Sequence, residues 1–501
     1  MSSAAPQILS TVVNVPTWRT GRRSLFGDRS RSSSLGAPAP ASFGDTDALQ
    51  LEEDPEFKLP RRTSLAIVIL TNALLQISFF IIVSSSSAYA ESLGGTATFS
   101  GLVIGIPTVF SGLSLIPLMK VDQGVYKRPL HFACTFAVIG NILYGLAYVT
   151  RFLYLILISR IVLGLSLTFF MYSKRYCSDP RIVGIRRRTT LAGWLVVGQG
   201  IGFSVGPFIG GLLYKIGFAN EVFNGYTSPG WIMAVLWIVF WVAAAFFYED
   251  VPKAPVSSNS STSAVELESS TPTPTPSYNS PNRPCPPTTL NSDRTENRDE
   301  LDENNHLTPQ RWGVIVCMCW YAMTCFFILG GWEANIPVYT ARAFHSTPFA
   351  AGNLIALGGV STFPFLFLNL WFARRVQDRV ILALGSGIGL IGLLIMLGTV
   401  KAGRTNFGTV FVSWFLVALG FNLASTVTLS LLSKQLPGEW NTRISLVIQY
   451  SNYTGRVLGA VWGGAGVSVG MLNYLGLQIA IVGIGGVMFL TLWRDLKAKT
   501  G

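Results

Sequence analysis

The sequence predicts an all-α, polytopic membrane protein in which twelve transmembrane helices form two pseudo-symmetric six-helix bundles. Half of its 501 residues are hydrophobic, only 12% are charged, and the mean hydropathy is +0.45. Soluble domains rarely have this composition. Twelve apolar windows have roughly the 20-residue length that crosses a bilayer. A polar segment divides them into six and six, which predicts the two bundles.

The twelve windows follow one another between Ser64 and Trp493. They lie at residues 64–88, 99–119, 129–150, 152–173, 190–214, 230–248, 312–338, 348–372, 380–400, 407–433, 444–467 and 471–493. We therefore expect one bundle over residues 63–250 and the other over 311–493. Residues 1–62 and 251–310 are too polar to bury a core. They are predicted to be a disordered tail and a disordered linker, and residues 494–501 a short C-terminal tail.

The distribution of positive charge predicts the orientation. Positive residues in short loops are held on the cytoplasmic side during insertion. With the N-terminus inside, 30 of the 37 Lys and Arg residues are cytosolic, five lie on the far side, and two, Arg160 and Arg456, lie inside windows. Both termini are therefore predicted to be cytosolic. The net charge of +12 needs no nucleic-acid partner.

Two amides and one arginine are the notable polar residues of the first and fourth windows. Asn72 and Gln76 are four residues apart, so they share a helix face. They could line a polar cavity or bond neighbouring helices, and both interpretations stay open. Arg160 lies in the middle of the fourth window, where a charge is costly and should face a cavity or a partner.

The fifth window, GWLVVGQGIGFSVGPFIGG, contains a specific glycine pattern. Its spacing resembles the fifth-helix signature of the major facilitator superfamily, and the matching residues are Gly193, Gly202, Gly206, Pro207, Gly210 and Gly211. The resemblance implies a secondary transporter with a central pathway between two bundles, and this signature is associated with antiporters. Glycines every fourth residue also let helices pack closely, so a purely structural interpretation stays open.

Two further features match this superfamily. The loop KVDQGVYKRP keeps Asp122, Gly124, Lys127 and Arg128, which the resemblance implies are a cytosolic gating loop. Arg160 is followed four residues later by a glycine, and the resemblance places this arginine on the pathway.

The second half repeats features of the first half. Gly455, Gly459, Gly463 and Gly464 follow the glycines of the fifth window 253 positions later, and FAAGNLIAL follows TFSGLVIGI 251 positions later. Two correspondences at nearly the same offset predict an internal duplication.

Within the superfamily, three short stretches are similar to the CLN7-like (MFSD8-like) and SPX-MFS branch. They are NGYTSPGWIMAVLW, GGWEANIPVY and GRVLG. No SPX domain fits the tail. The resemblance implies a vacuolar or lysosomal membrane. A chloride-channel-like protein stays open, as does a plasma-membrane exporter or peroxisomal carrier of a secondary metabolite.

The sequence shows no sign of an enzyme. Its three histidines, His131, His306 and His345, are scattered, and it contains no glycine-rich phosphate loop. We expect no cofactor, no metal site and no direct use of ATP. Energy would come from an ion gradient, with protons as the favoured ion.

The candidate pathway residues complete the hypothesis. Glu333 is the only carboxylate well inside a window, and a buried carboxyl is a functional candidate by default. We expect a monomeric, proton-coupled antiporter of a small anionic or polar metabolite, with Arg160 as the cation and Glu333 as a proton site near the luminal mouth. Arg456, with Gln449 and Tyr450 beside it, is the other candidate.

Overall fold

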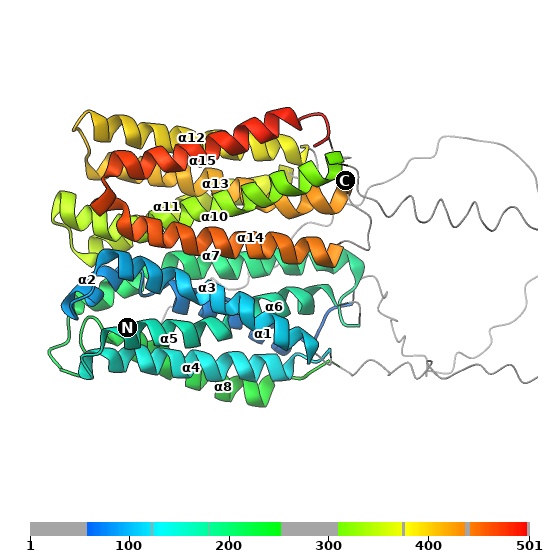
Figure 1. Cartoon of the computed structure of the whole chain (residues 1–501). Coiled ribbons are helices and arrows are strands. Elements are labelled where there is room, and N and C mark those ends of the chain that lie inside the picture. The colour runs from blue at the N-terminus through cyan, green and yellow to red at the C-terminus, as the bar shows by residue number, and fades with distance from the viewer. Residues whose placement is uncertain are drawn as a thin grey trace, which may run out of the picture. The chain divides into compact units, whose positions relative to one another are not determined.

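The computed structural model describes residues 58–121, 124–179, 181–251, 309–372, 376–435 and 441–497. The regular structure in these ranges is α-helical (Figure 1). The helices are α1 (Arg62–Phe80), α2 (Ser86–Ser92), α3 (Ala97–Lys120), α4 (Lys127–Val149), α5 (Leu153–Ser166), α6 (Phe169–Ser178), α7 (Ile185–Ile216), α8 (Ser228–Phe247), α10 (Pro309–Phe344), α11 (Pro348–Phe372), α12 (Asp378–Lys401), α13 (Phe407–Gln435), α14 (Asn441–Val469) and α15 (Met471–Thr491).

The described helices agree with the twelve predicted windows. Eleven spans are long and apolar enough to cross a membrane, and α5 and α6 together form one of them. The remaining helix, α14, has 29 residues, enough length to cross a bilayer, but its amides and Arg456 make it more polar than the others. The predicted twelve-helix fold is confirmed.

Two windows that were predicted to be continuous contain breaks. In the first, α1 ends at Phe80, turns occupy residues 81–85, and α2 follows. This break coincides with the serine run Ser84–Ser87, whose hydroxyls compete with the helix for backbone groups. In the fourth window α5 ends at Ser166 and α6 begins at Phe169. There the Thr168 hydroxyl donates to the Leu165 carbonyl at 2.8 Å.

The internal duplication is visible in how the glycines pack. In each bundle, one helix carries three glycines at four-residue spacing, and a methyl group on any of them would collide with the first helix of that bundle. The two sets are Gly202, Gly206 and Gly210 in α7 against α1, and Gly455, Gly459 and Gly463 in α14 against α10. The two bundles therefore share the same close packing, as the predicted duplication would require.

The remaining residues of the glycine signature behave differently. A methyl group on Gly193 would meet nothing within 4 Å, so close packing does not explain that glycine. Pro207 lies inside α7, where it removes one backbone hydrogen bond. Gly211 lies against Phe349 of α11, in the other bundle.

Two seams join the bundles. At the first, α3 packs on α14, and a methyl group on Gly101 would collide with the Ala460 carbonyl and approach Gly464. At the second, α7 packs on α11, and Gly352 lies against the Pro207 carbonyl. Backbone is close to backbone at both seams because the contact residues are small.

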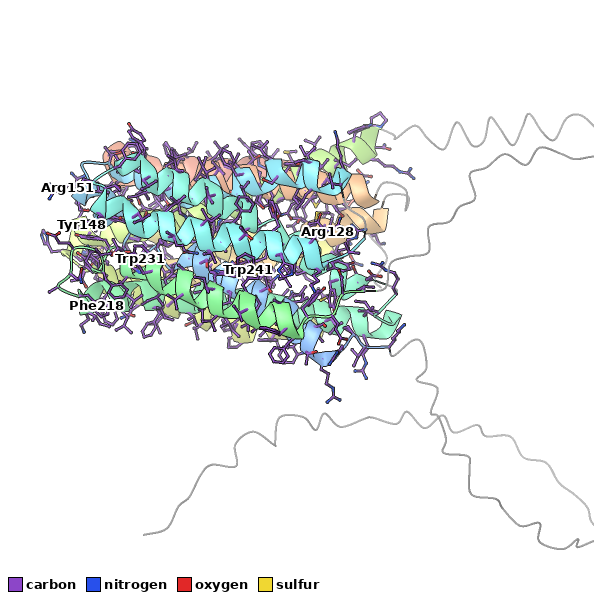
Figure 2. All side chains as sticks on the ribbon, turned by 90° about the horizontal axis from the view of Figure 1, so that it is seen from below. Arg128, Tyr148, Arg151, Phe218, Trp231 and Trp241 are labelled. Carbon is purple, nitrogen blue, oxygen red and sulfur yellow. The ribbon has the colours of Figure 1, made fainter. Side chains whose placement is uncertain are left out.

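The helices run between two ends of the bundle pair. Figure 2 shows Arg128 and Arg151 at opposite ends of the first bundle, near the start and just past the end of α4. We call the end at Arg128 the inner end, which the charge count predicts to be cytosolic. The end at Arg151 is the outer end.

Candidate functional site

A central cavity lies between the two bundles toward the inner end. This inner cavity has a volume of about 180 Å³ and receives side chains from α1, α3, α6, α7, α10 and α14. Its polar lining consists of amides, hydroxyls and two cations, namely Gln76, Gln199, Gln449, Asn452, Thr108, Ser111, Tyr453, Lys174 and Arg456. No carboxylate of a described residue lines it. The cavity therefore carries positive charge, which suits an anion.

Arg456 connects this cavity to the carboxylate that the sequence singled out. Its Nη2 donates a hydrogen bond to Glu333 Oε2 in an ion pair. Glu333 is only 1% exposed and Arg456 9%. The pair can form because the α14 glycines bring the two backbones together, with Gly459 against Phe327 of α10. Arg456 thus has Glu333 on one side and the cavity on the other.

The same guanidinium reaches the other bundle through aromatic rings. Arg456 Cζ lies 5.1 Å from the ring centroids of both Phe79 and Phe80, at the end of α1. Arg160 Cζ lies 5.5 Å from the centroid of Phe79. Phe79 therefore contacts both predicted arginines, one from each bundle, through cation–π interactions.

Arg160 has different partners. It is 2% exposed and donates to three backbone carbonyls, those of Ser78 at 3.2 Å, Phe79 at 3.0 Å and Val103 at 3.4 Å. The first two belong to the last turn of α1, where carbonyls have no partner within their own helix. A cation there also interacts favourably with the helix dipole. Arg160 therefore stabilises the end of α1, and it does not line the inner cavity.

The other predicted pathway residues divide into two groups. Gln76 and Gln449 line the inner cavity. Asn72 is fully buried and donates to Ser173 Oγ at 2.7 Å, so it ties α1 to α6. The Tyr450 hydroxyl donates to the Gly112 carbonyl at 3.1 Å and so crosses the first seam. Of the two amides on one face of α1, only Gln76 lines this cavity.

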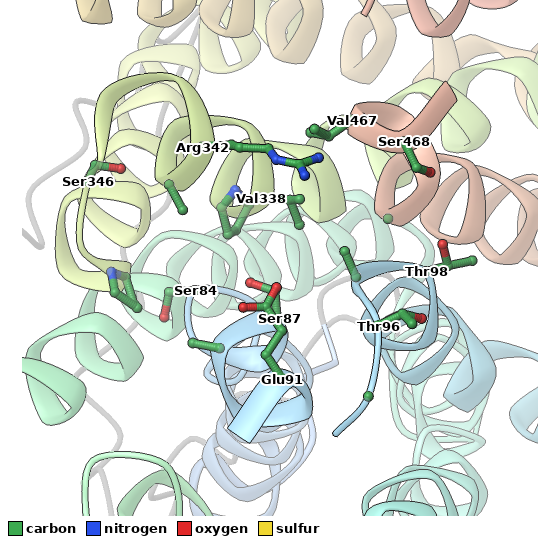
Figure 3. A pocket seen from close by; sticks show the side chains of 17 residues that line it. Ser84, Ser87, Glu91, Thr96, Thr98, Val338, Arg342, Ser346, Val467 and Ser468 are labelled. Atoms are coloured by element: carbon green, nitrogen blue, oxygen red, sulfur yellow. The ribbon is translucent and has the colours of Figure 1, made fainter. Parts of the chain in front are cut away.

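A second cavity lies between the bundles at the outer end. This outer cavity has a volume of about 760 Å³ and shares no lining residue with the inner cavity. Figure 3 shows Glu91 of α2 and Arg342 of α10 reaching into it from opposite sides. The buried Ser84 hydroxyl also lines it and has no hydrogen-bond partner. An acidic and a basic side chain thus line the cavity at the outer end.

The predicted gating loop is only partly described. Asp122 lies outside the described residues. Gly124 has φ of +71°, a conformation that favours glycine, and its carbonyl accepts a hydrogen bond from Arg181 Nη2 at 2.7 Å. The Lys127 backbone N–H donates to Asp250 at 3.1 Å. Arg128 lines a smaller cavity of about 140 Å³ at the inner end.

The loop contacts an ion pair that sequence reasoning did not identify. Arg181 pairs with Asp179 at 2.6 Å, and Asp179 also accepts from the Tyr126 hydroxyl at 2.8 Å. Burial acts to raise the pKa of Asp179, but the hydrogen bonds from Arg181 and Tyr126 outweigh it and hold this pKa below its ordinary value. The carboxylate is thus kept ionised beside the gating loop.

Several site residues carried no usable sequence signal. Phe79 and Phe80 are two aromatics among many in an apolar window, and nothing in the sequence places them beside arginines. Lys174 counted as a loop charge, but α6 extends to Ser178 and brings Lys174 to the inner cavity. The short spacing of Asp179 and Arg181 in SDPR could have indicated a loop ion pair.

Sequence comparisons agree with this architecture. The family model described as Major Facilitator Superfamily matches residues 68–460. An MFS-type transporter from Schizosaccharomyces pombe is 29% identical over 457 residues, covering 89% of this chain and 85% of its own. An SPX domain-containing membrane protein from Arabidopsis thaliana is 32% identical over 218 residues, which is 42% of this chain but only 30% of the plant protein.

Solved transporter structures share the fold. A POT family transporter in complex with 5-aminolevulinic acid superposes with a TM-score of 0.64, covering 88% of this chain and 99% of its own, at 10% identity. A bacterial homologue of the human lysosomal transporter Spinster, in an inward-facing conformation, gives 0.56 over 86% and 97% of the two chains, at 14% identity. At these identities the likeness concerns the fold alone.

Proposed function

The chain belongs to the major facilitator superfamily, and we propose that it moves a small anionic metabolite together with protons across an organellar membrane. The coarser part of this statement follows from the family: the protein is a multi-pass secondary transporter and not an enzyme. The proton, the anion and the membrane are our proposal.

One observation carries the proposal, namely that Arg456 stands between Glu333 and the inner cavity. A single guanidinium can neutralise one carboxylate fully, so a substrate anion in the cavity would compete with Glu333. Two anions that share the Arg456 guanidinium would each be only partly compensated, which is costly at low dielectric. Protonation of Glu333 removes that conflict.

This competition links the proton to the substrate. When Glu333 takes up a proton, Arg456 becomes available to an anion, and Lys174 adds a second positive charge to the same cavity. When Glu333 loses the proton, the ion pair forms again and the anion is released. Proton and anion therefore bind together, which supports cotransport. The glycine signature favours antiport, but the packing of its glycines on α1 gives most of that signature a structural role.

The aromatic contacts supply a route from the ion pair to the bundles. Arg456 belongs to the second bundle and lies against Phe79 and Phe80 of the first. Movement of Arg456 away from Glu333 would therefore act on the end of α1. Alternating access between the inner and outer cavities is the expected response.

The proposed location is a vacuolar or lysosomal membrane. The three short stretches NGYTSPGWIMAVLW, GGWEANIPVY and GRVLG support it, because they resemble a branch of lysosomal and vacuolar proteins. A fluorescent fusion imaged together with vacuolar, plasma-membrane and peroxisomal markers tests this proposal. Signal confined to either of the last two membranes would overturn it.

Proton coupling is tested with purified protein in liposomes that contain a pH-sensitive dye. Phosphate, chloride and a set of mono- and dicarboxylates are added outside one at a time, at equal pH. We expect at least one anion to acidify the lumen in wild-type vesicles, and Glu333→Gln to abolish this acidification. Exposed Glu221→Gln is the matched control. Ohmic chloride current without proton movement would instead indicate a channel.

A further inference from the structure

The seam between α7 and α11 contains a groove that the proposed transport cycle does not use. The groove has a volume of about 440 Å³ and is lined by Ser204, Val205, Phe208, Asn353, Ala356, Leu357 and Val360. Phe208, Leu357 and Val360 expose 43 to 57% of their surface. Both helices belong to the predicted membrane spans, so these apolar side chains face the hydrocarbon of the bilayer.

Two polar atoms in this apolar groove have no hydrogen-bond partner. They are Ser204 Oγ and Asn353 Oδ1, and Ser204 is 95% buried, with 5% of its surface exposed. An unpaired polar group in hydrocarbon is costly. A serine in a helix can usually donate to a carbonyl one turn earlier. The Thr426 hydroxyl in α13, for example, donates to the Leu423 carbonyl three residues before it. The orphaned pair therefore points to a ligand.

The duplicated seam provides an internal comparison. When the two halves are aligned at offsets of 251 and 253 positions, Leu102 corresponds to Asn353 and Val457 corresponds to Ser204. Both polar residues of the groove are thus apolar at the α3–α14 seam. Neither polar residue is needed for the seam to pack, since the duplicate packs without them.

The two seams differ in small residues at matching positions. The duplicate of Ala356, which lines the groove, is Gly105, where a methyl group would stand 3.0 Å from Val457 Cα. Pro207 removes a helical hydrogen bond from α7, and its duplicate is Ala460.

The chemistry of the groove selects the ligand. No charged side chain of a described residue lines it, so a charged head group would have no partner at this depth. Ser204 can donate, Asn353 Oδ1 can only accept, and a hydroxyl group does both. Pro207 lies close to Gly352, and Phe203 and Ser204 lie close to Gly359, so both polar residues line the same stretch of the α7–α11 seam.

We propose that this groove binds a sterol, whose single hydroxyl group bridges Ser204 and Asn353 while its apolar body lies along α7 and α11. A sterol matches the number of polar atoms in the groove, whereas the ester groups of a diacylglycerol would add acceptors with no donor. Because α7 and α11 belong to different bundles, the bound sterol stabilises the arrangement in which this seam is closed.

The test uses full-length protein in liposomes that contain a photoreactive sterol, with crosslinked peptides mapped by mass spectrometry. We expect labelling of α7 and α11, competition by unlabelled sterol, and weaker competition by the matching 3-keto steroid, which can accept from Ser204 but cannot donate to Asn353. The double variant Ser204→Val, Asn353→Leu copies the composition of the duplicate seam. It should reduce labelling about tenfold, because two hydrogen bonds of ordinary strength are lost.

The control is Thr426→Val, which removes an exposed hydroxyl whose hydrogen bond stays within its own helix. This variant should be labelled like the wild type. Equal labelling of the double variant would overturn the proposal, as would competition by a sterane hydrocarbon without a hydroxyl group that is as strong as competition by the sterol. Protection by diacylglycerol in place of sterol would also overturn it. Circular dichroism and gel filtration confirm that each variant is folded before labelling is compared.

Discussion

Arg160 and Arg456 are both buried arginines in membrane spans, and both lie against the ring of Phe79, yet their surroundings give them different roles. Arg160 is compensated by three backbone carbonyls. Arg456 is compensated by the carboxylate of Glu333 and borders a cavity. The comparison teaches that the group that compensates a buried cation, and not burial alone, decides whether that cation can exchange its partner during transport.

The physical difference lies in what the partners can do. A backbone carbonyl at a helix end has a fixed dipole and takes up no proton, so protonation cannot change the partners of Arg160. A carboxylate can be neutralised by a proton, and a buried one will be when its partner leaves. Arg456 is therefore the arginine whose interactions can change during transport.

The largest effect on stability is expected from Arg160→Met, which keeps much of the side-chain volume and removes the donors. The carbonyls of Ser78, Phe79 and Val103 would lose their partner, and each buried orphan costs about 1 to 3 kcal/mol. We expect a loss of about 3 kcal/mol or more, seen as a lower melting temperature in detergent and reduced monodisperse yield.

The control for Arg160 is Arg404→Met at the outer end, since Arg404 is exposed and should be neutral within about 0.5 kcal/mol. Arg160→Lys, with a single point charge in place of the planar fork, should fall between the two. If the Arg160→Met protein were stable and had lost only anion affinity, the structural role assigned to Arg160 would be wrong. Arg160 would then be a substrate-pathway residue.

Arg456→Gln is expected to have the largest effect on transport. Removing this cation takes away the anion partner in the inner cavity, and uptake should fall about 100-fold, the change expected for a loss of roughly 2.7 kcal/mol. Its stability should fall less than that of Arg160→Met, because Glu333 can take up a proton once its partner is gone. Anion uptake and melting temperature are measured on the same preparations.

The double variant Glu333→Gln, Arg456→Gln sharpens this contrast. It removes both charges together, which is commonly less harmful than leaving one buried charge alone. We expect its melting temperature to match or exceed that of Arg456→Gln, and its anion uptake to stay as low. Recovered uptake would show that Arg456 serves only to neutralise Glu333.

Much of the fold could be predicted from sequence because it follows from local composition. The lengths of the apolar windows predict the lengths of the spans, and the four-residue glycine spacing predicts close helix packing at α7 and α14. The breaks at residues 81–85 and 167–168 were missed, because they depend on which carbonyls find tertiary partners. Arg160, the partner of the first break, is far from it in sequence.

The candidate site was predicted only in part: Arg456, Gln76 and Gln449 line the inner cavity, Arg160 does not, and the pairing of Arg456 with Glu333 was not predicted. Arg160, Arg456 and Glu333 are conspicuous because charges in spans are costly. Which arginine meets the carboxylate depends on the packing of α10 on α14, and no single-residue pattern encodes that. Phe79 was missed for the opposite reason, since an aromatic residue in an apolar window is ordinary until its neighbours are known.

Phe79→Leu tests whether one ring links the two arginines. The substitution removes a cation–π partner of both, each worth about 0.5 to 2 kcal/mol, together with some apolar contact. We expect a stability loss of about 2 kcal/mol and slower uptake. Phe80→Leu is the matched variant, because the Phe80 ring lies against Arg456 and not against Arg160. This variant should slow uptake with a smaller loss of stability. Equal effects of the two variants would contradict the linking role of Phe79.

A third arginine, Arg181, gives the smallest expected effect and extends the comparison to the membrane surface. Its partner Asp179 has a lowered pKa, so the pair stabilises the fold above the ordinary carboxyl pKa of about 3.9 and loses that contribution as the pH falls through the lower folded pKa. Asp179→Asn should therefore cost about 1 kcal/mol at pH 7 and progressively less as the pH falls below about 3.9. Melting curves of wild type and variant across this range should converge at acid pH, whereas a constant difference would mean that the Tyr126 hydrogen bond, and not the charge, is what Asp179 contributes.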